Sequence, residues 1–320
     1  MNNTRTLRSV FVSSRSWLGF SLTIALVVLF ASTLALASTP QGTFEKTFQV
    51  SGPVDLEVLT RSGDITVRAG SSGSVSIRGK IFVGDRWLRG NRQSDVQEIE
   101  QHPPIRQEGN SIHIDYLNMH DISVDYEITV PADCTIRTHS GSGDQVIEGT
   151  RGNVDVQTGS GDVRLANLTG AVTLQTGSGD VRAREIAGAV RGGAGSGDIE
   201  LQETGQGDID LHTGSGNIEV RGIQGGFHAE AGSGDVTAEG TQNGAWEVHT
   251  GSGNVHVRLP ANAAFDADIS TSSGTIDVDS PIEMTVQGRV EEVRKSIRGK
   301  VRGGGQLLRV RTGSGDITIQ

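Results

Sequence analysis

The sequence predicts an all-β fold: a single-domain β-solenoid, similar to a β-helix, with two short strands in each coil of 18 or 19 residues. Three observations predict it: a recurring turn tetrapeptide, alternation of apolar and polar residues between the turns, and few aromatic residues. Aromatic residues make up 4% of the 320 residues, whereas glycine occurs 45 times. A core with so few rings is typical of a thin, repetitive interior.

The turn tetrapeptide is Gly-Ser-Gly-Asp or Gly-Ser-Gly-Asn. Its copies begin at residues 141, 159, 177, 195, 214, 232, 251 and 313, and the first seven are 18 or 19 residues apart. A degenerate copy, Ser272-Ser273-Gly274-Thr275, lies before the last one. Glycine suits turn positions with positive φ or close backbone approach. The strict recurrence favours stacked coils, about 4.8 Å apart, over an antiparallel meander that closes into a barrel or propeller.

Apolar residues alternate with polar ones in two short runs of each repeat. In the repeat 159–176, Val163 and Leu165 belong to the first run, and Val172 and Leu174 to the second. Alternation with a period of two is typical of a half-buried strand. A single buried column is therefore expected to follow the turns of successive coils: Val163, Val181, Ile199, Ile218, Val236 and Val255.

The first 37 residues have the pattern of an export signal. Three arginines precede an apolar run from Trp17 to Ala37, which ends in Ala35-Leu36-Ala37, a small-x-small sequence that signal peptidase accepts. The alternative is an uncleaved membrane anchor over residues 17–37, because about 20 apolar residues can span a bilayer. No cysteine lies near the cleavage site, which excludes a lipoprotein. We expect an exported protein, located in the periplasm, at the cell surface or outside the cell.

The rest of the chain is expected to form one domain with an irregular first part. Residues 38–130 follow the alternating pattern loosely and carry a polar insertion at 83–110, which indicates a protruding loop or a short helix. Residues 131–320 form the regular array. Without residues 1–37 the net charge changes from −10 to −13, since these residues hold three arginines and no acid. This charge argues against nucleic acids and anionic membrane surfaces as partners.

The order of these segments resembles that of a known family. A strand pair around Ser62-Gly63-Asp64 is followed by the polar insertion, the strand 124–131, the glycine-rich array and the closing copy at 313–316. This order resembles a bacterial adhesin family, a domain of unknown function found in envelope proteins, over about residues 44–320. The resemblance implies a β-solenoid at the cell envelope and supplies no catalytic residues.

A column of carboxylates after the turns is the sharpest candidate site. Carboxylates in register repel by roughly 1 kcal/mol per adjacent pair even in water. Either bound Ca²⁺, which takes several oxygen ligands, or turn N–H groups that donate to each carboxylate could offset this repulsion. We favour turn capping and expect no cofactor, because Asp directly follows Gly here, unlike in the calcium-binding nonapeptide repeat. The column comprises Asp144, Asp162, Asp180, Asp198 and Asp235, and Asn217 and Asn254 continue it.

The other polar residues give weaker signals. Arg182 and Glu200 occupy equivalent positions on adjacent coils, so we expect an ion pair between them, of the kind that contributes little at a surface. His212 and His249 are two coils apart, about 10 Å, too far for direct ligation of one zinc ion. The single cysteine, Cys134, cannot form an internal disulfide and is expected to be a small buried residue.

These observations indicate a non-enzymatic exported envelope protein, an adhesin or a surface interaction or scaffold module with an unknown envelope or cell-surface ligand. An alternative is a sensing module for an envelope ligand or cation, which retention of residues 17–37 in the membrane would favour. A third is a polysaccharide-active β-helix enzyme. Its sugar site would be expected to stack aromatic rings, but the array holds only Phe227, Trp246 and Phe265, which the alternation directs inward.

Overall fold

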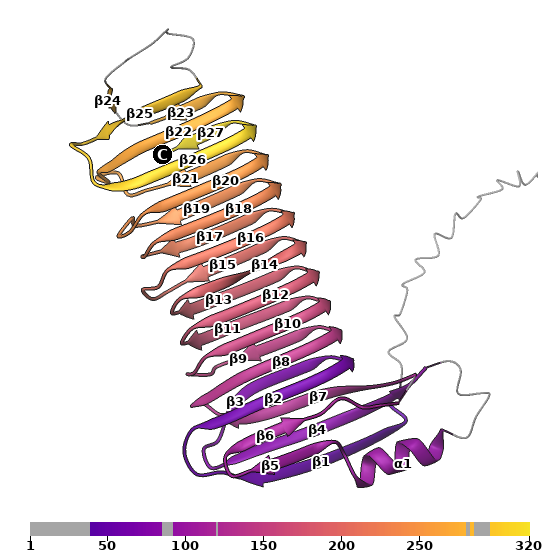
Figure 1. Ribbon diagram of the computed structural model, residues 1–320. Coiled ribbons are helices and arrows are strands. Elements are labelled where there is room, and N and C mark those ends of the chain that lie inside the picture. Colours follow the sequence, from indigo (N-terminus) through magenta and orange to yellow (C-terminus); the bar gives the residue numbers. More distant parts are fainter. Residues whose placement is uncertain (1–38, 85–91, 120, 280–281, 285–294) are drawn as a thin grey trace, which may run out of the picture. The chain divides into compact units, whose positions relative to one another are not determined.

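A computed structural model describes residues 39–84, 92–119, 121–279, 282–284 and 295–320 (Figure 1). Residues 39–320 form one compact unit. The expected export signal at residues 1–37 lies outside the described residues. Within the described residues, no helix is long and apolar enough to cross a membrane.

Two sheets build this unit, with one strand of each coil in each sheet. Sheet A has thirteen strands among the described residues. In spatial order they are β1 (Gly42–Gln49), β4 (Ser74–Val83), β7 (Ile122–Pro131), β3 (Ile65–Gly70), β9 (Gln145–Glu148), β11 (Val163–Thr169), β13 (Val181–Ala187), β15 (Ile199–Glu203), β17 (Ile218–Ile223), β19 (Val236–Gly240), β21 (Val255–Arg258), β27 (Ile317–Ile319) and β23 (Ile276–Val278).

Sheet B has fourteen described strands. In spatial order they are β24 (Ile282–Met284), β25 (Ser296–Val301), β22 (Phe265–Ser273), β26 (Gln306–Ser314), β20 (Trp246–Ser252), β18 (Phe227–Ser233), β16 (Ile209–Ser215), β14 (Val190–Ser196), β12 (Val172–Ser178), β10 (Val154–Ser160), β8 (Cys134–Ser142), β2 (Val54–Ser62), β6 (Ser111–Ile114) and β5 (Ile105–Glu108). The strands of successive coils pair in parallel, which confirms the solenoid.

The core lies between the sheets and consists of columns of small aliphatic residues. The column expected after the turns is confirmed: Val163 pairs with Val181, Val181 with Ile199, and the register continues through Ile218 and Val236 to Val255. All six side chains are buried. The large rings Phe227 and Trp246 also point inward, as expected, and meet edge to face with centroids 5.7 Å apart.

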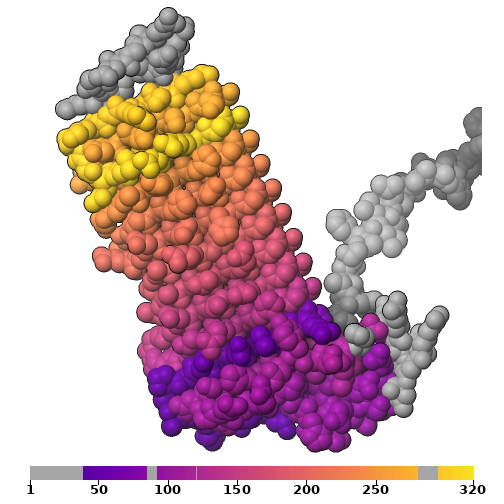
Figure 2. All heavy atoms as spheres, in the orientation of Figure 1, coloured from indigo at the N-terminus to yellow at the C-terminus, as the bar shows by residue number. Residues whose placement is uncertain are grey.

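The turn glycines permit the coils to stack at this spacing. Gly161 has φ +151°, and a Cβ on it would lie 2.1 Å from the carbonyl oxygen of Gly143 on the preceding coil. Any side chain here would push the coils apart, so this turn position requires glycine. Figure 2 shows the turns of successive coils as evenly spaced projections along one edge.

The N-terminal part contributes one regular coil and a group of strands beyond it. Strands β2 and β3 form that coil, and β2 pairs directly with β8, with Ser62 opposite Ser142. Strands β1, β4 and β7 extend sheet A, and β5 and β6 extend sheet B. The described part of the polar insertion contains helix α1 (Gln93–Gln101), which contacts β1, and strand β5.

The order of the last coils differs from the order of the sequence. Strands β26 and β27, which end the chain, lie between the coil of β20 and β21 and the coil of β22 and β23. The degenerate turn at 272–275 therefore stacks on the turn at 313–316 and not on the one at 251–254. As a result, the N–H of Gln320 donates to Val257 inside the stack.

Candidate functional site

The carboxylates after the turns form a continuous hydrogen-bonded column. The backbone N–H of Asp162 donates to Oδ1 of Asp144 at 3.0 Å, that of Asp180 to Asp162 at 3.1 Å, and that of Asp198 to Asp180 at 3.1 Å. The N–H of Asn217 donates to Oδ1 of Asp198 in the same way, and equivalent hydrogen bonds continue the column through Asp235 and Asn254 to Asp316.

Each donor lies on the next coil, whereas the expectation of Asx-type capping placed it in the same turn. The N-terminal coil joins the column as well, since the N–H of Asp144 donates to Asp64 and that of Asp64 to Asp125. The amide oxygen of Asn217 accepts the same bond as a carboxylate, from Asp235 at 2.9 Å. This explains why Asn alternates with Asp, because only an oxygen acceptor is needed.

Arginines neutralise the first carboxylates of the column. Arg164 donates to Asp144 at 2.9 Å and to Asp162 at 2.8 Å, and Arg182 donates to Asp180 at 2.8 Å. Burial alone would raise the pKa of Asp144, but hydrogen bonds from Arg164 and from the Asp162 N–H outweigh burial and lower it. These pairs offset part of the repulsion between stacked charges.

The expected ion pair between Arg182 and Glu200 is not the one observed. The two residues are opposite each other in the register. However, Arg182 turns toward the turn carboxylates, and Glu200 lies 3.6 Å from Arg184. The carboxylate column lies beside the start of the strand that carries Arg182. The guanidinium of Arg182 therefore contacts two carboxylates of that column and does not pair with Glu200, which is opposite it in the sheet.

Among the described residues, no group of three or more His, Cys, Asp or Glu side chains is positioned to hold a metal ion. His212 and His249 are exposed and flank Glu230 on the strand between them. Cys134 is buried, and burial raises the pKa of its thiol to about 12.

The outward face of sheet B carries a second column, in which basic and acidic residues alternate along the stack. Thr173 interrupts the alternation between β6 and β25, and Arg106 on the edge strand β5 does not continue it, because it is opposite the basic residue His113. From the N-terminal end, the column is His113, Glu57, Arg137, Asp155, Thr173, Arg191, Asp210, His228, Glu247, Arg309, Asp268 and Arg298.

Neighbours in this sheet B charge column form ion pairs. His228 lies 3.1 Å from Asp210, and Arg309 lies 2.7 Å from Glu247 and 3.4 Å from Asp268. The hydrogen bond from His228 lowers the pKa of Asp210. Most of these side chains are partly exposed, so each pair contributes little to stability, and the charges remain accessible to a partner.

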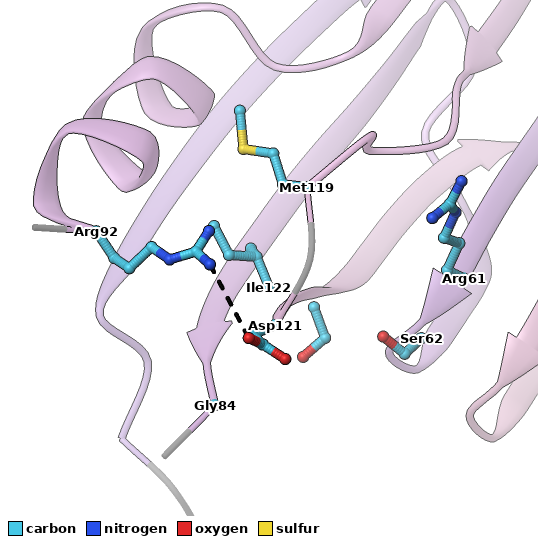
Figure 3. A pocket seen from close by; sticks show the side chains of 8 residues that line it. Arg61, Ser62, Gly84, Arg92, Met119, Asp121 and Ile122 are labelled. Carbon is cyan, nitrogen blue, oxygen red and sulfur yellow. Dashed lines mark ion pairs between the residues drawn. The ribbon is translucent and has the colours of Figure 1, made fainter. Parts of the chain in front are cut away.

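Two cavities lie near the N-terminal end of the stack, and Arg61 borders both of them. The larger, of about 680 Å³, is bordered by Ser62, Arg92, Asp121 and other residues. Figure 3 shows Arg92 reaching from the start of α1 toward Asp121, with a nitrogen-to-oxygen distance of 3.9 Å. Arg61 and Ser62 reach this cavity from the end of β2.

The smaller cavity, of about 340 Å³, is bordered by Thr60, Arg61, Tyr116, His139 and Gly141. Tyr116 meets His139 edge to face with centroids 6.2 Å apart. It is also the one large hydrophobic side chain that is exposed among the described residues, at 41%. The guanidinium of Arg61 has no hydrogen bond or ion pair with any described residue.

A sequence signal for this site exists, although our sequence analysis did not identify it. The turn of the first coil reads Arg61-Ser62-Gly63-Asp64, with arginine where the eight complete copies of the tetrapeptide have glycine. In the array, a Cβ at this position would clash, as at Gly141, where it would lie 2.5 Å from the carbonyl oxygen of Arg61. Arg61 meets no such neighbour, because β6 pairs with β2 only as far as Val58.

Comparisons with solved structures give likenesses at low identity. A candidate cell adhesion protein of Clostridium sporogenes is 11% identical, with 87% of this chain and 98% of that chain covered and a TM-score of 0.21. A candidate adhesin of Bacteroides fragilis is 14% identical (88% and 100% covered, TM-score 0.33). A candidate lipid-binding protein of Parabacteroides distasonis is 11% identical (88% and 99% covered, TM-score 0.36). At these scores the likenesses indicate neither a ligand nor a function.

No curated protein matches the chain. The family comparison, by contrast, covers nearly all of it, in two overlapping matches at residues 38–208 and 187–320. It agrees with the resemblance to a domain of unknown function that the turn repeats implied. The chain belongs to the Toastrack DUF4097 family.

Proposed function

We propose that this protein is a non-enzymatic interaction module of the bacterial envelope, an adhesin or a scaffold that binds its partner through the outward face of sheet B. The observation that carries the proposal is the sheet B charge column, which follows that face from β6 to β25. The smaller cavity beside Arg61 lies on the same face, next to His139 of β8.

The fold supports binding because it fixes the spacing of the charges. Backbone pairing and the carboxylate column join every coil to the next, so charged groups on adjacent strands stay about 4.8 Å apart. A face that is already ordered loses little conformational entropy on binding, and its charge pattern selects partners. Exposed ion pairs within the column are weak, so a partner can replace them with pairs of its own.

The export signal in the sequence supports an envelope location for this module. We propose that residues 1–37 direct export and are then removed. Mass spectrometry of the N-terminus of the exported protein tests this step. A mature protein that begins at Ser38 is expected, and a retained segment 17–37 would show membrane anchoring.

Co-sedimentation of the purified, labelled protein with intact bacterial cells tests the binding function. We expect saturable binding that weakens as salt is added, since exposed charges are screened within about 10 Å at 0.1 M ionic strength. Heat-unfolded protein is the control. Binding that does not saturate, or release of reducing ends from cell-wall polysaccharides by the protein, would contradict a non-enzymatic interaction module.

A further inference from the structure

We propose that the smaller cavity beside Arg61, defined by Thr60, Arg61, Tyr116, His139 and Gly141, binds the acidic sugar units of a carboxylated saccharide. This inference rests on the proposed function and names a ligand class for one end of the binding face. Arg61 would hold the carboxylate, and Tyr116 would stack against the sugar ring.

Arg61 is the group that selects an anion. Its guanidinium is without a described partner, although the chain carries a net charge of −10. The nearby arginines are engaged: Arg92 contacts Asp95 at 3.2 Å, and Arg137 contacts Asp55 at 2.8 Å. A guanidinium presents paired N–H donors that match the two oxygens of a carboxylate, so a free one in such surroundings favours a carboxylate ligand.

Tyr116 and His139 supply the surface for the ring. Tyr116 is 41% exposed, whereas Tyr126 and Trp246 are buried. Its edge-to-face contact with His139 holds the tyrosine ring over the outward face of sheet B, next to Arg61. The cavity of about 340 Å³ lies at the lower end of the range for small-molecule sites, which suits one or two sugar units.

The backbone around the cavity favours a saccharide over a peptide. A peptide that adds as a strand needs a run of unpaired N–H and C=O groups along a sheet edge. Strand β6 already pairs with β2 over Asp55–Val58 and β8 pairs with the other side of β2, which leaves only Leu59–Ser62 without a strand on one side. That run is shorter than a typical strand, so recognition falls to the side chains.

Isothermal titration calorimetry of the full-length protein tests the inference with three acidic probes: oligogalacturonate, a glucuronate-containing chondroitin oligosaccharide and sialyllactose. The matched control ligand is methyl-esterified oligogalacturonate, which keeps the sugar rings and removes the charge. We expect at least one acidic probe to bind and the methyl ester to bind about tenfold more weakly or not at all, because the charge-assisted bond to Arg61 is lost.

Variants locate the site on the protein. We expect Arg61→Gln and Tyr116→Ala each to weaken binding of the acidic probe about tenfold or more. Tyr116→Phe should preserve binding, and Arg184→Gln, a control on sheet A whose side chain is 62% exposed, should have no effect. Melting curves show whether each variant is folded.

Three results would overturn the inference: no binding of any acidic probe, equal binding of the ester and the acid, or unchanged binding by folded Arg61→Gln protein. Cell binding separates this inference from the proposed function. If wild-type protein fails to distinguish acid from ester but still binds cells saturably, the saccharide site is wrong and the interaction module stands. If wild-type protein does not bind cells at all, the proposed function itself fails.

Discussion

Glu203 places a carboxyl group in a column of the core that other coils fill with aliphatic side chains. It is opposite Ile186 in the register, and Ile186 is opposite Leu168. Glu203 is 3% exposed, and neither carboxyl oxygen has a hydrogen-bond partner of normal geometry among the described residues. Burial raises its pKa to about 7, the nearby N–H of Gln224 opposes burial only in part, and the charge of Asp208 adds to the rise.

The raised pKa sets the direction of a pH effect on stability. The folded protein holds the proton of Glu203 more tightly than the unfolded chain, whose pKa is near 4.5. The contribution of Glu203 to the free energy of unfolding is therefore greatest below pH 4.5 and declines as the pH rises from about 4.5 to about 7. A pKa rise of this size corresponds to roughly 3 kcal/mol.

Chemical denaturation of wild-type and Glu203→Ile protein between pH 4 and pH 8 measures this contribution. We expect the isoleucine variant to gain stability relative to wild type as the pH rises, by roughly 3 kcal/mol over the range. The difference between the two proteins isolates Glu203 from acids such as Asp144 and Asp210, whose lowered pKa values act in the opposite direction. Glu203→Gln serves as the control, since its uncharged amide should also remove the pH dependence. A difference that stays constant across this range would refute the reasoning.

Three further predictions follow from the stack. Millimolar Ca²⁺ or a chelator should leave the melting temperature of wild-type and Asp162→Asn/Asp180→Asn protein nearly unchanged. An ion at a hundredfold excess over its dissociation constant would stabilise the folded protein by about 2.7 kcal/mol. Stabilisation of this size in wild type, lost in the double variant, would make the carboxylate column a metal site. Val181→Asp should lose several kcal/mol in urea unfolding, because an unpaired charge would enter the core; near-native stability would contradict the buried column. Gly179→Ala should also lower the free energy of unfolding by several kcal/mol, since its Cβ would lie 2.1 Å from the Gly161 carbonyl oxygen at φ +155°. The control Gly73→Ala, at φ +92° with nothing within 4 Å, should lower it by about 1 kcal/mol. Equal losses in the two variants would refute the steric argument.

The repeating part of the fold could be predicted from the sequence because its cause is local. Alternation placed Val163 and Val181 in one column, and the spacing of the turns set the register between coils. The order of the final coils could not be predicted in this way. The turns at 272–275 and 313–316 are both compatible with stacking on the turn at 251–254, and only the pairing of whole strands decides between them.

Side-chain partners and the cavities depended on long-range packing. The register alone suggested Arg182 with Glu200, but the guanidinium reaches the turn carboxylates beside its own strand. Tyr116 and His139 are in contact although they are distant in the sequence, and no pattern in the sequence predicted this contact. Arg61 and Glu203 did leave a signal, because each breaks the residue pattern of its column, and such exceptions in a repeat mark positions where the local environment differs.

The central claim is that the outward face of sheet B binds the envelope partner, and reversal of charge on each sheet tests it most directly. Arg191→Glu/Arg298→Glu changes two exposed arginines of sheet B, and Arg184→Glu/Arg258→Glu changes two of sheet A with side-chain exposures of 62% and 58%. The measurement is the dissociation constant for intact cells by co-sedimentation. We predict that the sheet B variant binds at least about tenfold more weakly, while the sheet A variant binds like wild type. Equal effects of the two folded variants, or a larger effect on sheet A, would contradict the claim.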